Sequence, residues 1–532
     1  MSIEWQGARR PRVYWRAWPG EKREILLVAA ALLFTATALT LPAALGPVRL
    51  NDSFWIDCVW LEQFARALGN GTLYPRWLPL SHGGLGSPVF YYYPPLAFYA
   101  GSAFVFAGLG TYSSLVATFF AASLLSGIGV YLWLKDQSRT PLIGALLFMV
   151  APYHLFDFYQ RGAVAEFVAI AILPFVLWGI RKAIQGKSRA FAWIALSYAS
   201  LIMSHLPLAL LASLFLFVPY TLLGARQSVP ALLKIGGALA TGVALAAIYI
   251  LPAVALEPYR SGTELWALPY LQPASWSLWN AEAWTLKTYR AVLLMIATIA
   301  IPLVALSVRR RSGWALWALA CAALAAGAVP MLWSLPPLHS VQFPFRLLPI
   351  AELAFVTAAM LAPPGQLSWP TLWVPLLTMA GFIIAAEPEN VALSPRAVET
   401  IHPDVPENLP PGQRPYSWPS RWALEIAALH PRPQFDGKIT VEPAFYFPSW
   451  QVRCGNHEVP TFPDPRTKLL AHEGRRCSRK IGWTMPERIS ALVSLIALLI
   501  LVGVSARGLL TPSAASPGRH RSLRRGTRPR NT

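Results

Sequence analysis

Residues 91–108 have the sequence YYYPPLAFYAGSAFVFAG, an apolar run between two longer ones at 24–46 and 113–134. All three lie between the basic tail that ends at Arg23 and the basic loop that begins at Lys135. Because loops rich in Lys and Arg stay in the cytoplasm, an even number of crossings must separate two such loops. The run at 91–108 is the weakest spanner, since it combines adjacent prolines with aromatic and small residues. We therefore expect it to lie on the outer membrane surface.

The same rule fixes the later crossings, each of which needs about 20 predominantly apolar residues. Basic positions mark the inner loops at Lys135 and Arg139, Arg181 to Arg189, Arg226 and Lys234, Arg309 to Arg311, and the tail from Arg507. The runs between them are 139–153, 163–180, 190–206, 207–223, 234–255, 291–308, 313–333, 346–363, 370–386 and 487–506. The predicted fold is an all-α polytopic membrane protein with about 12 transmembrane helices. The alternative is that all three early runs cross and one weak later run does not.

The composition agrees with a membrane protein and excludes several soluble classes. Of the 532 residues, 55% are hydrophobic and only 13% are charged. The net charge of +20 is concentrated in short loops and tails, which indicates membrane topology and not nucleic-acid binding. The sequence has no Walker-type loop, dinucleotide fingerprint or HExxH helix. We expect a multi-pass protein of the bacterial inner membrane with both termini in the cytoplasm, and its first apolar run as an uncleaved signal anchor.

The predicted organisation has five parts. They are a basic tail at 1–23, a transmembrane domain at 24–386 with a first extracytoplasmic loop at 47–112, an extracytoplasmic segment at 387–485, a last helix at 486–506 and a basic tail at 507–532. The extracytoplasmic segment begins Pro-rich, and KITVEPAFYFPSWQVRC at 438–454 has β-type composition. It is either a lid or acceptor-binding module, or a simple cap. Cys454 and Cys477 within it are a candidate disulfide in an oxidising compartment, or two free thiols.

This topology brings the polar residues of several loops to the outer face. The candidate site residues are Asp52 and Asp157, together with ten candidates for substrate binding: Asp57, Arg76, His154, Arg161, Glu166, His205, Arg260, Lys287, Arg290 and Arg346. Glu166 falls inside a predicted span, where an acidic side chain is costly unless it is paired or functional. Arg161 lies five residues earlier, so the two residues form either a structural salt bridge or part of a binding site. Simpler roles exist for the others. Asp52 is a candidate helix cap, Asp57 a polar face of a short helix, and Arg346 a snorkelling side chain.

Five motifs resemble a known family. They are GTLYPRW at 71–77, GSPVFYYYPPLAFY at 86–99, YHLFDFYQRGAVAE at 153–166, SHLP at 204–207 and QFPFR at 342–346. Together they resemble the bacterial membrane family labelled 6-pyruvoyl-tetrahydropterin synthase-related, which is similar to the GT-C superfamily of integral membrane glycosyltransferases. The resemblance covers about residues 49–346. It implies a GT-C-like fold with a juxtamembrane helix in the first external loop.

The resemblance also implies a chemistry. The donor would be a polyprenyl-phosphate-linked sugar in the membrane lipid, and the acceptor a glycan, lipid or protein of the cell envelope. Asp52 would be the general base, and Asp157 would orient the acceptor or support a divalent cation, Mg²⁺ or Mn²⁺. Arg346, Arg260, Lys287 or Arg290 would stabilise the leaving phosphate. Where family members often have a His shortly after the first acid, this chain has SFWID at 53–57.

Two other function classes stay open from the sequence. A transporter or flippase for a lipid-linked substrate needs polar residues through the membrane midplane and usually has internal repeats, whereas most predicted spans here are nearly free of charge. A non-catalytic envelope assembly protein would keep the fold without an active site. The missing His after Asp52 is the feature that favours this second alternative.

Overall fold

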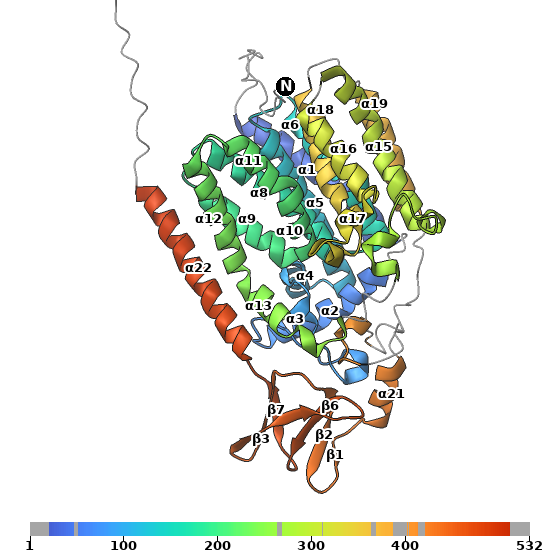
Figure 1. Ribbon diagram of the computed structural model, residues 1–532, viewed down its shortest axis with the longest axis vertical. Helices are drawn as coiled ribbons and strands as arrows, with labels where there is room; N and C mark the ends of the chain where they lie inside the picture. The colour runs from blue at the N-terminus through green and yellow to red at the C-terminus, as the bar shows by residue number, and fades with distance from the viewer. Residues whose placement is uncertain are drawn as a thin grey trace, which may run out of the picture.

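A bundle of long helices with a small sheet module at one end makes up the protein (Figure 1). The structure is a computed structural model and describes residues 21–46, 52–262, 269–310, 312–362, 369–386, 402, 404–412 and 421–510. The two predicted basic tails, at 1–23 and 507–532, lie largely outside these residues.

Eight helical segments among the described residues are long and apolar enough to cross a membrane. They are Lys22–Ala44 in α1 (Glu21–Ala44), α5 (Thr111–Leu134), Pro141–Arg161, α8 (Val164–Ile184), Leu206–Ala225, Lys287–Val304 in α15 (Lys287–Arg310), Pro344–Leu361 and Met485–Ala506 in α22 (Met485–Leu510). A ninth is the pair α12 (Val229–Leu245) and α13 (Ala247–Ala255), bent by 62°. Shorter apolar helices occupy the other predicted positions, in α9 (Ala190–Ser204), α16 (Gly313–Ala325) and α19 (Trp369–Ala385). The predicted polytopic all-α fold is confirmed.

The run at 91–108 forms no long helix. It contains the end of α3 (Val89–Tyr92) and all of α4 (Leu96–Phe106), and α4 has only 11 residues. At 1.5 Å per residue α4 is about 16 Å long, roughly half the thickness of the hydrocarbon core. It packs against α2 (Asp52–Gly69) and α5, at the sheet end of the bundle (Figure 1). The first loop therefore contains the predicted juxtamembrane helix.

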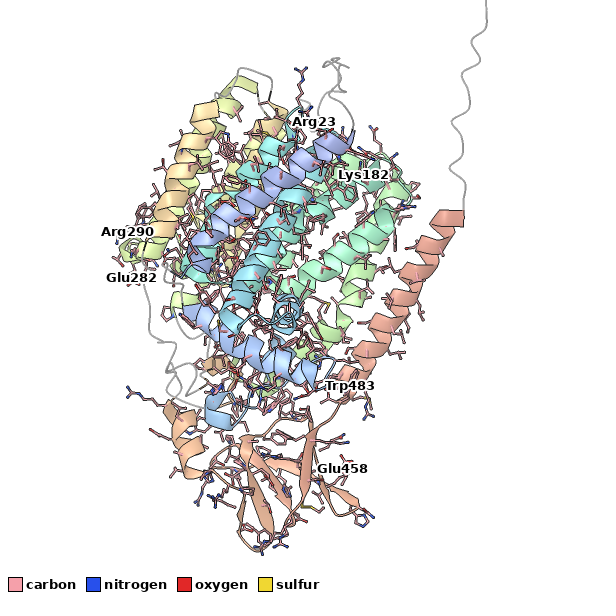
Figure 2. The ribbon with its side chains drawn as sticks, turned by 180° about the vertical axis from the view of Figure 1, so that it is seen from behind. Arg23, Lys182, Glu282, Arg290, Glu458 and Trp483 are labelled. Carbon is pink, nitrogen blue, oxygen red and sulfur yellow. A yellow bond between two sulfur atoms is a disulfide. The ribbon has the colours of Figure 1, made fainter. Side chains whose placement is uncertain are left out.

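The two ends of the bundle differ in character. Figure 2 shows Arg23 and Lys182 at the end far from the sheet, where Figure 1 also shows α6 (Pro141–Met149) and α11 (Val218–Ala225). Trp483 and Glu458 lie at and beyond the opposite end (Figure 2). The described basic loops thus gather at one end and the sheet module at the other, as the crossing count requires.

The sheet module contains two small antiparallel sheets. One has the order β1 (Gln434–Phe435), β2 (Ile439–Phe445), β6 (Leu469–Glu473), β5 (Thr461–Pro463), and the other the order β4 (His457–Val459), β3 (Trp450–Cys454), β7 (Ser478–Ile481). Burial alternates along β2, so one face is turned inward. The ring of Trp422 from α21 (Arg421–Leu429) stacks on Phe445, and a disulfide joins Cys454 to Cys477.

A buried ion pair joins the first loop to the last helix. Arg76 Nε lies 3.0 Å from Glu487 Oε1, and both side chains are almost fully buried. Arg76 Nη2 donates to the Ile248 carbonyl at 2.8 Å, while Thr484 donates its backbone N–H to Glu487 Oε2 at 2.7 Å. The pair therefore ties the first loop, α13 and the start of α22 together. Arg76, which the sequence analysis assigned to substrate binding, lies at this junction.

We predict that Glu487→Ala strongly lowers the thermal stability of the purified protein in detergent. Removing one partner leaves the Arg76 guanidinium buried without its carboxylate, which typically costs about 3–5 kcal/mol. The matched control is Glu62→Ala, which breaks the exposed pair with Arg66 at 2.7 Å and should cost about 0–1 kcal/mol. Equal melting temperatures for the two variants would contradict a joining role for Arg76 and Glu487.

Candidate functional site

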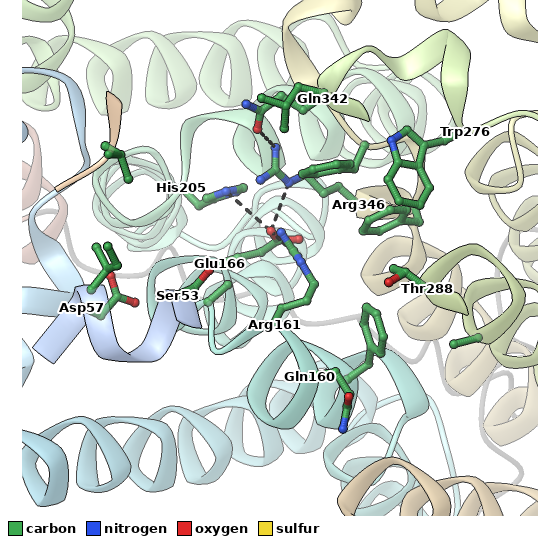
Figure 3. A pocket seen from close by; sticks show the side chains of 18 of the residues that line it. Ser53, Asp57, Gln160, Arg161, Glu166, His205, Trp276, Thr288, Gln342 and Arg346 are labelled. Carbon is green, nitrogen blue, oxygen red and sulfur yellow. Dashed lines mark hydrogen bonds and ion pairs between the residues drawn. The ribbon is translucent and has the colours of Figure 1, made fainter. Parts of the chain in front are cut away.

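A cavity of about 960 Å³ lies where the first loop, the helix tips and residues 405–408 meet. Its wall comes from α2, from residues 156–166, from His205 and Arg260, from the start of α15, from residues 342–346, and from the end of α19. Figure 3 shows α2 with Ser53 and Asp57 on one side and Thr288 and Trp276 on the other. Segments far apart in sequence thus share one cavity.

The carboxylate of Glu166 is the centre of the cavity floor (Figure 3). Its Oε2 lies 2.7 Å from Arg161 Nη1, 3.1 Å from Arg346 Nε and 3.6 Å from His205 Nε2. Tyr153 donates its hydroxyl to Oε1 at 2.7 Å. Glu166 itself is fully buried. A carboxylate in such a place is tolerated because cations and hydroxyls satisfy both oxygens.

Arg346 is held from its other side as well. Its Nη1 donates to the Val341 carbonyl at 2.6 Å and to Gln342 Oε1 at 3.0 Å. Gln342 has a φ of 68°, a left-handed conformation that costs a non-glycine residue of order 1–3 kcal/mol. The guanidinium plane of Arg346 is therefore fixed between Glu166 and this strained turn, and the side chain does not snorkel to a surface.

A close contact between α2 and the connection from α7 to α8 positions Arg161 on the cavity floor. After α7 (Pro152–Phe156) the chain makes one wide turn over Asp157–Arg161 and then reaches Gly162 at φ 61°. A Cβ at Gly162 would lie 2.8 Å from the Cβ of Phe54 in α2. Only glycine suits both this φ and this distance. The turn thereby brings Arg161 alongside the first turn of α2.

Asp157 contacts Arg161 from the side that faces away from the cavity. Its Oδ1 accepts from Arg161 Nη1 at 2.7 Å, and the residue is fully buried and does not line the cavity. Asp157 and Glu166 together balance the charges of Arg161 and Arg346. Asp157 is therefore a positioning residue for Arg161 in this geometry.

His154 lies deeper in the bundle, away from the cavity. Its Nδ1 is 3.6 Å from Glu352 Oε2, and its ring packs against Phe148 and Phe167. The backbone N–H of Tyr153 donates to Glu352 Oε1 at 2.6 Å. The sequence analysis missed Glu352, although an acid inside the predicted span at 346–363 was the signal that could have found it.

Asp57 of α2 lies at the cavity wall opposite α15. Asp57 lines the cavity and is almost fully buried, and burial raises the pKa of its carboxyl well above the ordinary value, while a hydrogen bond from the Val164 backbone opposes the shift. The side chain of Asp52 lies outside the described residues, but its backbone begins α2 directly before Ser53, which lines the cavity. Burial thus favours the protonated form of the Asp57 carboxyl.

The α15 side of the cavity has exposed cations and an apolar wall. Lys287 and Arg290 are exposed at the start of α15, and among the described residues neither is ion-paired to a carboxylate. Arg260 Nε lies 3.9 Å from Glu257. Leu294 of α15 and Phe382 of α19 line the cavity and are both exposed. The apolar wall of the cavity is therefore made by side chains of two helices that contact each other.

Most of the expected residues meet at this cavity. It is lined by Asp57, Arg161, Glu166, His205, Arg260, Lys287, Arg290 and Arg346, but not by Arg76, His154 or Asp157. Sequence analysis missed the lining residues Trp60, Gln342, Glu407 and Asn408. Glu407 and Asn408 lie in a Pro-rich segment with no regular period, so no sequence pattern indicated that they return to the bundle.

The described carboxylates of the cavity do not suit a divalent cation. Glu166 is already ion-paired to two guanidinium groups, and burial raises the pKa of the Asp57 carboxyl well above its ordinary value. Glu407 is the one further carboxylate among the described lining residues. Among the described residues, the one cluster of His, Cys, Asp and Glu side chains with metal-ligand spacing is Cys454, His472 and Cys477 in the sheet module, where the two sulfurs are bonded to each other. Hard cations need several free oxygen ligands. The chemistry of the cavity is therefore derived from its side chains alone.

The fold and the cavity define a polytopic membrane protein with an ion-paired pocket at one end of its bundle. The chain belongs to the family described as the 6-pyruvoyl-tetrahydropterin synthase related domain, a membrane protein family whose model matches residues 90–391. No curated protein matches the sequence.

Two solved structures of the arabinofuranosyltransferase AftD from Mycobacteria are similar to the chain, one of them of a mutant. Each is 17% identical with a TM-score of 0.43, and the matches cover 69% and 68% of this chain. The chain spans only 28% and 27% of the lengths of those proteins. Likeness at this level fixes neither the fold nor the activity.

The raised pKa of Asp57 gives a pH-dependent prediction for Asp57→Asn. Above about pH 4 the unfolded chain loses this proton while the folded protein keeps it up to its raised pKa. The stability contribution of Asp57 therefore falls as pH rises through that window, and Asn removes the fall. We expect the melting temperature of the variant relative to wild type to increase between pH 5 and pH 8.

The control is Glu62→Gln, an exposed acid on the same helix. It should show no such trend. A difference between Asp57→Asn and wild type that is constant with pH would show that Asp57 is ionised in the folded protein.

Proposed function

We propose that this protein is a membrane glycosyltransferase, which moves a sugar from a polyprenyl-phosphate-linked donor to a cell-envelope acceptor on the extracytoplasmic face of the bacterial inner membrane. The observation that supports this most is the combination of exposed cations and an apolar wall on one side of the cavity. A lipid phosphate needs both, because its head is an anion and its tail is a hydrocarbon.

The apolar wall supports a donor that stays in the lipid. Leu294 and Phe382 are exposed apolar residues of the cavity, on α15 and α19, two helices in contact with each other. A polyprenyl chain between them would leave the cavity sideways while its phosphate stayed near Lys287. Desolvated apolar area of this kind contributes about 25 cal/mol per Å².

The cations of the cavity fall into two groups, those that are ion-paired to carboxylates and those that are exposed. Arg161 and Arg346 are neutralised by Glu166 and Asp157, and so are poorly available to a new anion. Lys287 and Arg290 are exposed and lie at the start of a 24-residue helix, whose N-terminal end favours negative charge. We assign the donor phosphate to Lys287 and Arg290, with Arg260 as a further candidate cation.

The proposed transfer uses only side chains of the protein. The acceptor oxygen bonds to C1 of the sugar, the bond from C1 to the phosphate oxygen breaks, and the phosphate leaves with the electron pair. Lys287 and Arg290 stabilise the charge that develops on the leaving oxygen. The acceptor proton goes to Asp52, the proposed general base at the first turn of α2.

We also propose an orientation of the bundle in the membrane. Basic loops at the end far from the sheet favour the cytoplasm for that end and for both termini. The sheet module and the cavity would then be extracytoplasmic, where a disulfide between Cys454 and Cys477 is stable.

We predict that the double variant Lys287→Ala, Arg290→Ala binds farnesyl phosphate at least tenfold more weakly than wild type in lipid nanodiscs. Each charge-assisted hydrogen bond is worth about 1.5–3 kcal/mol, which is roughly tenfold or more in affinity. Arg189→Ala, an exposed cation at the far end of the bundle, should leave binding unchanged. Unchanged binding in the double variant would remove the basis of the phosphate assignment.

The function itself is tested with Asp52→Asn in a deletion strain. The variant should insert normally and bind farnesyl phosphate as wild type does, yet fail to restore envelope glycosylation. If it complements the deletion fully, Asp52 is not the base, and a non-catalytic assembly role becomes the better account. A wild-type protein that moves lipid-linked sugar across a vesicle membrane without transferring it would instead favour a flippase.

A further inference from the structure

Residues 404–410, here called the strap, form part of the cavity lining and are fastened at both ends. Trp60 Nε1 of α2 donates to Asp404 Oδ1 at 3.2 Å. At the other end Ser261 donates its backbone N–H to the Leu409 carbonyl at 2.9 Å and its hydroxyl to the Pro410 carbonyl at 2.8 Å. Trp60, Asp404 and Ser261 are all buried. The strap therefore belongs to the cavity wall and is not a loose cover.

The strap turns two polar side chains toward the cavity. A short 3-10 turn at Pro406–Asn408 places Glu407 and Asn408 among the lining residues. Burial raises the pKa of Glu407 to about 7, with Asp404 adding to the rise and Arg260 opposing it. Near neutral pH the carboxyl is thus partly ionised and accepts hydrogen bonds readily.

The wall next to the strap is aromatic. Trp60, Tyr92 and Tyr93 line the cavity, and Trp60 and Tyr93 pack edge to face with ring centroids 4.9 Å apart. The Tyr92 hydroxyl donates to the Leu256 carbonyl, which fixes that ring. Together with Glu407 and Asn408, this side offers rigid apolar faces beside a carboxylate and an amide.

The two sides of the cavity therefore suit different chemical groups. Lys287 and Arg290 on the α15 side suit an anion. The α2 side has no exposed cation of this kind among its described lining residues, apart from Arg260, whose guanidinium carbon lies over the Tyr92 ring at 4.4 Å. Carboxylate, amide and aromatic faces suit a ligand with many hydroxyl groups and apolar C–H faces, which is a carbohydrate.

We propose that the strap and α2 form the acceptor subsite, and that its ligand is a neutral oligosaccharide. This inference rests on the proposed transferase function. Glu407 and Asn408 bind hydroxyl groups of the acceptor, while Tyr92 and Tyr93 pack against its sugar rings and Trp60 holds the strap beside them. A uronic acid at this position would meet the like charge of Glu407, so anionic acceptors are disfavoured.

The test uses the whole protein in nanodiscs with one reporter, Val405→Cys, at the cavity wall. The described free thiols Cys58 and Cys321 are buried, so a maleimide labels the reporter first. A neutral hexose or pentose tetrasaccharide should slow the labelling, and a uronic acid tetrasaccharide should not. Adding Glu407→Gln should weaken the protection by the neutral tetrasaccharide about tenfold or more, the usual size for a hydrogen bond to a charged group.

The matched control is Glu425→Gln, an exposed acid on α21 outside the cavity, which should leave the protection unchanged. If Glu407→Gln lowers the melting temperature, Asn408→Ala replaces it with the same expected loss. The proposal is overturned if no neutral tetrasaccharide protects the reporter, if uronic acid protects equally, or if the Glu407 and Glu425 variants behave alike.

Farnesyl phosphate binding in the same nanodiscs separates this proposal from the proposed function. Lipid phosphate binding without protection by neutral sugars overturns the acceptor subsite alone. Protection by neutral sugars without lipid phosphate binding overturns the transferase and leaves a carbohydrate-binding site.

Discussion

The buried carboxylate of Glu166 is the constraint on which the rest of the site depends. Arg161, Arg346, His205 and Tyr153 all lie around it. Tyr153 and Arg161 belong to one segment, and His205 and Arg346 come from two others that are distant in sequence. A buried charge is tolerated only when its partners are in place, so these segments must meet in one geometry. The carboxylate thereby fixes the tips of several helices relative to one another and forms the rigid floor of the cavity.

A rigid floor explains why the two sides of the cavity can differ. Because Arg161 and Arg346 are already ion-paired to Glu166, the exposed cations Lys287 and Arg290 are the ones open to a new anion, and they lie on the α15 side. The chemical character of the α2 side is determined by its buried side chains and by the strap, residues 404–410. Catalysis by positioning needs such fixed, separate subsites, since a group transfer requires both reactants at once. The proposed donor and acceptor sites follow from this division.

The sequence predicted the apolar helices and several residues that line the cavity, but it did not predict which distant side chains pair with each other. Parity of basic loops predicted the short surface helix at 91–108, because charge and apolar length are local properties. It could not tell that Arg76 pairs with Glu487, more than 400 residues away, or that Glu407 returns to the cavity. Such contacts depend on long-range packing, which no periodicity records. Arg161 and Glu166 were paired correctly because they are neighbours across one turn.

In the proposed function, the cavity binds a lipid phosphate on its α15 side. The most direct test is an electron cryomicroscopy map of the protein with decaprenyl phosphate in nanodiscs. Our account predicts phosphate density within about 3 Å of the side-chain nitrogens of Lys287 and Arg290. The chain should leave between Leu294 and Phe382. Phosphate density at the far end of the bundle, or lipid bound only outside the cavity, would contradict it.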